Sequence, residues 1–171
     1  MVHRLATREY RRLATTAILG VALSALSLPA PAAAADAAGC ARLAGVHIRA
    51  ADIGLPSRGP VIETAAVETA AANPQAPDAT IEFCKLAGRI APVDAQAPDI
   101  TVEINLPLVW NGKAVPYGGG GYNGVLITGL APLRDAPPDL PTPLARGYAS
   151  WGTDSGHQAS ALPEIQAFAL N

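Results

Sequence analysis

The sequence has few aromatic residues, few charges and no excess of basic residues. Aromatic residues make up 5% and charged residues 15% of its 171 positions, and the formal net charge is −2. Nucleic-acid-binding domains carry an excess of lysine and arginine, so the composition argues against that function. No apolar run reaches the roughly 18 residues that a membrane-spanning helix needs. With 50% hydrophobic residues the chain is also not of the highly charged, disordered class, and its length predicts one domain.

The first 35 residues have the three-part pattern of a secretory signal peptide. A cationic start contains four arginines, residues 13–28 are apolar, and small residues stand at 33–35. We expect cleavage after Ala35 by the general secretory route, a secreted protein (extracellular or periplasmic), and no membrane attachment after cleavage. An uncleaved N-terminal anchor is the alternative. Cleavage would leave a more acidic chain, because this segment holds four of the 12 basic residues but one of the 14 acidic ones.

Only two cysteines are present, Cys40 and Cys84. Two cysteines in an exported protein usually pair. This pair would close a loop of about 45 residues, which the chain-entropy model values at roughly 4 kcal/mol. Two free buried thiols are the alternative. No Cys-x-x-Cys and no pair of histidines accompanies them, so the spacing does not predict a zinc site. We expect no metal or cofactor to be bound by this chain.

Alternating apolar and polar residues predict a sheet with few helices. Strands are expected at 61–70, 80–90, 114–117 and 147–153, a loop at 73–79, and a helical turn at 143–146. Residues 100–106 alternate strictly, which is typical of a half-buried strand, and Pro107 should end it. The fold class is therefore α/β, with an incomplete sheet of mostly antiparallel strands. Four glutamates on polar strand faces are expected to be solvated: Glu63, Glu68, Glu82 and Glu103.

Residues 118–124 read Gly-Gly-Gly-Gly-Tyr-Asn-Gly and follow a predicted strand. Glycine lets backbone N–H groups come close to a ligand. Such a loop can form an oxyanion hole, as it does in α/β hydrolases, or it can cradle phosphate. The segment lacks the Gly-Lys-Ser/Thr ending of a phosphate-binding P-loop, which argues against phosphate. A flexible surface loop is the remaining alternative.

Asp154, Ser155 and His157 stand within five residues, but we do not interpret them as a catalytic triad. Triad members must converge in space, and residues two apart seldom provide the nucleophile and its base with usable geometry. Ser155 also lacks the Gly-x-Ser-x-Gly context of a nucleophile elbow. We instead expect Asp154 and His157 to hydrogen-bond within a tight loop at a strand end.

Several segments occur in a distinctive order, in which Trp-Asn-Gly, the glycine run and Thr-Asp-x-Gly-His are the most specific. They are Cys40 with its apolar surroundings, Phe-Cys-Lys-Leu-Ala-Gly-Arg-Ile at 83–90, the alternating strand at 100–106, Leu-Pro-Leu-Val-Trp-Asn-Gly-Lys at 106–113, the glycine-rich residues 118–124, Arg-Gly-Tyr-Ala at 146–149 and Thr-Asp-Ser-Gly-His at 153–157. In this order they resemble the tannase and feruloyl esterase family of secreted α/β hydrolases.

The resemblance implies hydrolysis of esters of aromatic carboxylic acids. The family uses a serine nucleophile in a Cys-Ser-x-Gly-Gly motif, with an aspartate and a histidine further along. By position, Gly121 would donate its backbone N–H to the oxyanion, and Cys40 and Cys84 would form the N-terminal disulfide. The family also has a lid domain, often with calcium.

The sequence contains no Cys-Ser-x-Gly-Gly motif. We therefore expect residues 36–171 to be the N-terminal part of a hydrolase domain, truncated before the nucleophile and inactive alone. A second hypothesis is a small secreted binding or structural domain that uses the glycine-rich loop for recognition. In that case Trp110, Tyr117 and Tyr122 would stack on an aromatic ligand.

Overall fold

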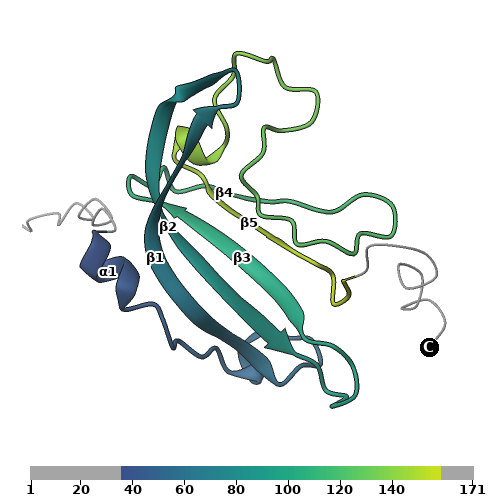
Figure 1. The fold of residues 1–171 in the computed structure, drawn as a ribbon. Coiled ribbons are helices and arrows are strands. Elements are labelled where there is room, and N and C mark those ends of the chain that lie inside the picture. Colours follow the sequence, from purple (N-terminus) through teal and green to yellow (C-terminus); the bar gives the residue numbers. More distant parts are fainter. Residues whose placement is uncertain (1–35, 159–171) are drawn as a thin grey trace, which may run out of the picture. The chain divides into compact units, whose positions relative to one another are not determined.

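The computed structural model describes residues 36–158, which contain one five-stranded sheet and very little helix (Figure 1). The strand order is β1-β2-β3-β5-β4, and all neighbours are antiparallel except β4 and β5, which are parallel. The strands are β1 Gly59–Asn73, β2 Ala76–Ala91, β3 Ile100–Pro107, β4 Ala114–Pro116 and β5 Ala149–Thr153. The helical segments are α1 Ala37–Ala41 and the 3₁₀ turns η1 Ala50–Asp52 and η2 Leu144–Arg146.

The expected strand-rich α/β class, mostly antiparallel with few helices, is confirmed. The helical turn expected at 143–146 is η2, and the strand expected at 100–106 ends one residue later, at Pro107. The expected signal peptide, residues 1–35, lies outside the described residues. Within residues 36–158, no helix has the length and apolar character needed to cross a membrane.

The prediction of a loop at 73–79 is wrong, because β1 and β2 form one long hairpin (Figure 1). Pro74 and Gln75 make its two-residue turn, and the N–H of Gln75 donates to Asn73 Oδ1 at 2.8 Å. This Asx turn is a compact alternative to a longer connection. Pro77 is tolerated in β2 because the pairing slips between Ala71 and Asn73, and proline fits at such irregularities.

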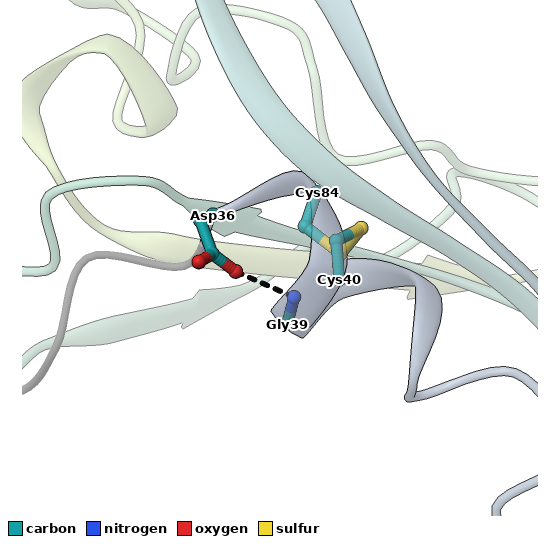
Figure 2. Close-up of a disulfide and its surroundings, with 4 residues drawn as sticks. All are labelled: Asp36, Gly39, Cys40 and Cys84. Carbon is teal, nitrogen blue, oxygen red and sulfur yellow. Dashed lines mark hydrogen bonds between the residues drawn. A yellow bond between two sulfur atoms is a disulfide. The ribbon is translucent and has the colours of Figure 1, made fainter.

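One face of β1 and β2 is apolar, and α1 packs against it. The buried residues of this core are Cys40 from α1 and Ile62, Cys84 and Leu86 from the two strands. Asp36 caps α1, since its Oδ1 accepts a 2.6 Å hydrogen bond from the N–H of Gly39. Figure 2 shows this cap beside the disulfide between Cys40 and Cys84, whose Cα atoms are 5.6 Å apart. The paired form of the two cysteines is therefore confirmed.

The disulfide should be a major source of stability, because it attaches a five-residue helix to the central part of β2. Replacing both cysteines by alanine should lower the free energy of unfolding by roughly 4 kcal/mol, the value expected for a loop of this length. Urea denaturation of both proteins would measure the difference. Adding a reductant should destabilise only the parent, and an equal effect on the variant would contradict this assignment.

The opposite face of β3 is polar and buried, which corrects the expectation that Glu103 is solvated. Glu103 is 4% exposed, and Asn105 and Ser150 are fully buried. Residues 125–129 cover this face: the Asn105 Nδ2 donates to the carbonyl of Thr128 at 2.6 Å. The other three glutamates, Glu63, Glu68 and Glu82, are exposed as expected.

The cost of burying the Glu103 carboxylate is only partly offset by its neighbours. Its nearest cation is Lys85, whose Nζ lies 3.7 Å from Oε2 of Glu103 and 3.3 Å from Oε2 of Glu68. Burial raises the pKa of Glu103, although the Lys85 cation and the Asn105 side chain oppose this. The other carboxylate oxygen, Oε1, has no hydrogen-bond partner among residues 36–158. Burial therefore makes the charged form of Glu103 less favourable than that of an exposed glutamate.

Glu103→Gln should stabilise the protein at neutral pH by about 1 kcal/mol, because a neutral amide is cheaper to bury. A raised folded-state pKa means that the folded protein binds this proton more tightly than the unfolded chain does. Parent stability should therefore increase as the pH falls through that pKa. The stability advantage of Glu103→Gln should vanish as the pH falls toward 4.5, the ordinary pKa of a glutamate. Denaturation at several pH values would measure this.

Glu68→Gln is the matched control, since Glu68 shares Lys85 but has a side chain that is 48% exposed. This substitution should change stability by less than about 1 kcal/mol, without the same pH dependence. A loss of stability in Glu103→Gln at neutral pH would contradict the assignment.

Candidate active-site loops

The glycine run and the segment Thr-Asp-Ser-Gly-His leave the sheet side by side. β4 and β5 are parallel, with Ala114 opposite Ala149 and Pro116 opposite Trp151. The N–H of Tyr117 continues this pairing by donating to the carbonyl of Trp151 at 2.8 Å. Parallel neighbours end at the same edge of a sheet, which is where α/β proteins place their ligands. The two motifs singled out in the sequence are thus brought together.

Asn123 connects the two loops. Its Nδ2 donates to Ser155 Oγ at 2.8 Å and to the carbonyl of Thr153 at 3.4 Å. Its N–H closes a turn on the carbonyl of Gly120 at 3.0 Å. Its φ of 59° lies in the left-handed region, which asparagine tolerates better than most residues. Sequence reasoning missed this residue, although an Asn-Gly pair after a glycine run is a usable signal for such a turn.

The glycines of the run have different roles. At Gly119 a Cβ atom would overlap the side-chain amide of Asn123, so the connection requires glycine there. At Gly118, Gly120 and Gly121 a Cβ would meet no atom within 4 Å, so these positions face open space. Gly121 has a φ of 59°, a conformation that disfavours a side chain.

The N–H groups of residues 118–121 donate no hydrogen bond to any part of the chain that the structure describes. Backbone donors that have no acceptor within the protein can bind a negatively charged oxygen. A carbonyl oxygen on its way to a tetrahedral intermediate is one such oxygen. The arrangement is therefore chemically suited to an oxyanion hole.

Asp154 holds the second loop to β3 and is 1% exposed. Its carboxylate accepts hydrogen bonds from the N–H groups of Thr101 and Gly156, at 3.0 and 2.9 Å, and from Gln158 Nε2 at 2.9 Å. Burial alone would raise the pKa of Asp154, but these hydrogen bonds outweigh it and lower the pKa. These hydrogen bonds therefore favour the charged form of Asp154, which ties the loop to β3.

The side chains of Ser155 and Asp154 hold the loop in place. Ser155 Oγ bonds to the Asn123 amide, and Asp154 bonds to the backbone and to Gln158. The expected link between Asp154 and His157 exists as a backbone hydrogen bond of 3.4 Å from the N–H of His157 to the carbonyl of Asp154. Among residues 36–158, no group of three or more His, Cys, Asp or Glu side chains could hold a metal ion.

An open groove of about 470 Å³ lies beside the glycine run. Of the three aromatic residues considered as ligand-stacking groups, Tyr117 lines this groove. Its hydroxyl donates to the carbonyl of Ala131 at 2.6 Å, and burial raises its pKa, so it remains neutral. Trp110 and Tyr122 are about half exposed and lie outside the lining. Sequence reasoning also missed Arg134, which lines the groove from a later turn.

The link between Asn123 and Ser155 should be measurable as a coupling energy. Asn123→Gly and Ser155→Gly each remove one partner while tolerating the left-handed backbone at both positions. We expect each to destabilise the protein by about 1 kcal/mol, and the double-mutant cycle to give a coupling of about 0.5 to 1.5 kcal/mol. Combining Asn123→Gly with the distant Glu68→Gln should be additive. Additivity of the first pair in urea denaturation would mean that the two loops are not connected in this way.

Comparison with known proteins places both loops in a recognised family. The family model described as tannase and feruloyl esterase matches residues 84–171, which include both loops. An uncharacterised esterase of Agrobacterium fabrum is 43% identical over 141 residues, which are 82% of this chain and 25% of that protein. The mono(2-hydroxyethyl) terephthalate hydrolase of Piscinibacter sakaiensis is 30% identical over 109 residues, which are 62% of this chain and 18% of that protein.

The chain spans a quarter or less of the length of these two curated relatives. The family match nevertheless covers about half of the chain and starts in the middle of β2. It includes the parallel pair of strands and the loops that follow them. This chain therefore belongs to the tannase and feruloyl esterase family.

Proposed function

We infer that this chain supplies the oxyanion loop of a secreted carboxylic ester hydrolase that acts on esters of aromatic acids. The observation that carries this proposal is the glycine run after β4, whose N–H groups donate no hydrogen bond among the described residues and which has open space beside Gly118, Gly120 and Gly121. Family membership supports it, as do two relatives named as an esterase and as a hydrolase of a terephthalate monoester. The disulfide is consistent with export to an oxidising compartment.

In the proposed reaction, a serine attacks the ester carbonyl while a histidine removes its proton. The carbonyl oxygen becomes negatively charged, and the backbone N–H of Gly121 donates a hydrogen bond to it. One such donor contributes on the order of 3 kcal/mol to the stabilisation of the transition state. The sequence has no Cys-Ser-x-Gly-Gly motif. The nucleophile would therefore come from outside these 171 residues, and this chain alone should not hydrolyse esters.

Asn123 and Gly119 would act as positioning residues in this enzyme. The Asn123 amide lies so close to Gly119 that a Cβ there would overlap it, and we expect this fit to position the N–H groups that follow. Its hydrogen bond to Ser155 attaches the loop to the end of β5. A preformed loop of this kind stabilises the oxyanion without reorganising during the reaction, which is the physical basis of oxyanion-hole catalysis.

A chimera tests the proposal. The matching quarter of the Agrobacterium esterase is replaced by the corresponding residues of this chain, and hydrolysis of methyl ferulate and methyl gallate is followed. We expect the chimera to be active. Gly119→Ala should lower kcat by about 100-fold with little change in KM, because the displaced donors act mainly in the transition state.

Gly45→Ala is the matched control. Unlike Gly119, Gly45 has open space where a Cβ would lie, and its φ of 79° is left-handed, so alanine there strains the backbone outside the loop without displacing a neighbouring side chain. The chimera that carries Gly45→Ala should have the same kcat as the unsubstituted chimera. A folded chimera without activity would overturn the proposal, as would an equal kcat for Gly119→Ala and Gly45→Ala. So would turnover by the purified 171-residue chain that is lost in Ser155→Ala, since this would place the nucleophile within the chain.

A further inference from the structure

β1 forms an outer edge of the sheet, and the middle of this edge is uncovered (Figure 1). Near the start of the strand, the N–H and the carbonyl of Ile62 are hydrogen-bonded to residues 45–46. Near its end, the N–H of Thr142 donates to the carbonyl of Ala72 at 2.9 Å. Between these two contacts, the backbone of residues 64–71 forms no hydrogen bond to any described residue outside β2.

The uncovered stretch lacks the features that usually protect an edge strand. Residues 64–71 read Thr-Ala-Ala-Val-Glu-Thr-Ala-Ala, without proline or lysine. Proteins commonly block an exposed edge with proline, with charged side chains or with a bulge. The two irregularities in the pairing of β1 lie at the ends of this stretch, around Glu63 and Ala72. The stretch between them is longer than the usual strand of about five to six residues and can pair with another strand.

Glu68 is the only charged residue of the stretch, and its charge is compensated within the hairpin. Its Oε2 lies 3.3 Å from the Nζ of Lys85 in β2. Just before the stretch, Oε1 of Glu63 accepts a 2.6 Å hydrogen bond from Nε of Arg89, also in β2. The edge therefore presents little net charge to an approaching strand and does not favour a strongly charged partner.

The pairing of β1 with β2 shows which residues direct their backbone groups outward. Opposite residues in an antiparallel pair alternate between hydrogen-bonded and non-hydrogen-bonded positions. Both backbone groups of Ile62 bond away from β2, so its pair with Gly88 is non-hydrogen-bonded. The same holds at every second residue of β2 from there, and the partners of these residues are Ala65, Val67 and Thr69. Their N–H and carbonyl groups therefore point away from the sheet.

We propose that this edge pairs with the same edge of a second copy of the chain, antiparallel about a two-fold axis, with Val67 opposite Val67. In this register, the outward backbone groups of one copy meet those of the other. Ala66 lies opposite Glu68, and Ala65 lies opposite Thr69, so each larger side chain faces a small one. The β-branched pair at the centre is of a type that stabilises sheets.

Other registers of the same pairing are less favourable. Shifting the second copy by two residues in one direction places Glu68 opposite Glu68, and like charges directly opposite each other destabilise a sheet. Shifting it by two residues in the other direction extends the pairing into the irregularity around Glu63. The proposed register uses only residues 64–70. The stretch is thus complementary to itself, which is the requirement for a two-fold interface.

The proposed dimer goes beyond the esterase function and does not depend on it. β1 and β4 are the two opposite edges of the sheet. Pairing through β1 therefore leaves the loops that follow β4 and β5 accessible in both copies. The two copies would share one continuous sheet with both candidate sites at its outer ends.

Sedimentation equilibrium of the purified chain over a range of concentrations tests the proposal, and we expect a reversible monomer–dimer equilibrium. Thr69→Pro removes an outward N–H that β2 does not use, so the hairpin should tolerate it. It should raise the dimer dissociation constant about 30-fold, the effect of one lost backbone hydrogen bond in each copy. Thr69→Ala keeps the N–H and is the matched control, with an unchanged dissociation constant. Circular dichroism of each variant reports whether it folds like the parent.

Two substitutions of Ala66 test the register. Ala66 is exposed and, in the proposed dimer, faces Glu68 of the second copy. Ala66→Glu should weaken the dimer and Ala66→Lys should strengthen it, each by about fivefold, because the two-fold axis creates two such pairs. Within one chain, position 66 is opposite Lys85, so Ala66→Glu is also compatible with the fold. Weaker dimerisation of this variant would not be a consequence of unfolding.

Three results would overturn the inference: a chain that stays monomeric at every concentration, equal dissociation constants for Thr69→Pro and Thr69→Ala, or shifts in the same direction for the two Ala66 variants. A monomer would mean that this edge serves no second copy, and the other two results would assign the dimer to a different surface or register. None of these measurements depends on turnover. An inactive chimera therefore leaves the dimer untouched, and a monomeric chain leaves the proposed esterase function untouched.

Discussion

The position of β5 between β3 and β4 is the constraint on which the rest of the site depends. β5 is five residues long and is paired on both sides, antiparallel to β3 and parallel to β4. The parallel pairing makes the glycine run and the Thr-Asp-Ser-Gly-His segment leave the sheet at one edge. The antiparallel pairing places Asp154 against Thr101 of β3. Without β5 in this place the two loops, about thirty residues apart in sequence, would have no reason to meet.

The same placement explains why the second face of the sheet is buried and polar. The chain between β4 and β5 passes back over β3 and β5, where the N–H of Ile127 donates to the carbonyl of Thr153 at 3.3 Å. This approach is close enough that a side chain at position 152 would overlap the Ile127 carbonyl, which accounts for Gly152. An irregular segment brings unpaired backbone carbonyls onto the sheet, and polar side chains such as Asn105 satisfy them.

Sequence patterns located most of the strands but not what covers them. The strict alternation at 100–106 predicted β3, yet it could not show that a later loop would cover the polar face and bury Glu103. The prolines at 74 and 77 suggested a loop, because local composition does not reveal that one proline begins a turn and the other lies where pairing slips. The cysteine pair was foreseeable, since composition left few alternatives.

The candidate site shows the same division between local and long-range information. The glycine run and the Asp154 loop could be recognised from residues next to one another in sequence. Asn123 could not, because its role depends on Ser155, which lies 32 residues away. Arg134 was also missed, since a single exposed arginine in a proline-rich loop has no local signal of function. The hydrogen bond from the Tyr117 hydroxyl to the carbonyl of Ala131 is a long-range contact that links this turn to the end of β4, beside the glycines.

The glycine run satisfies several physical requirements that no other residue type meets together. Gly119 must leave room for the Asn123 amide, Gly121 must adopt a left-handed backbone, and the N–H groups of the run must remain accessible. A side chain at any of these positions would fill the space or restrict the conformation. A run of glycine is usually a sign of flexibility, but here its backbone is held at Asn123, at Tyr117 and through β5. The loop therefore combines N–H donors that have no acceptor among the described residues with a fixed position, and the proposed oxyanion stabilisation depends on that combination.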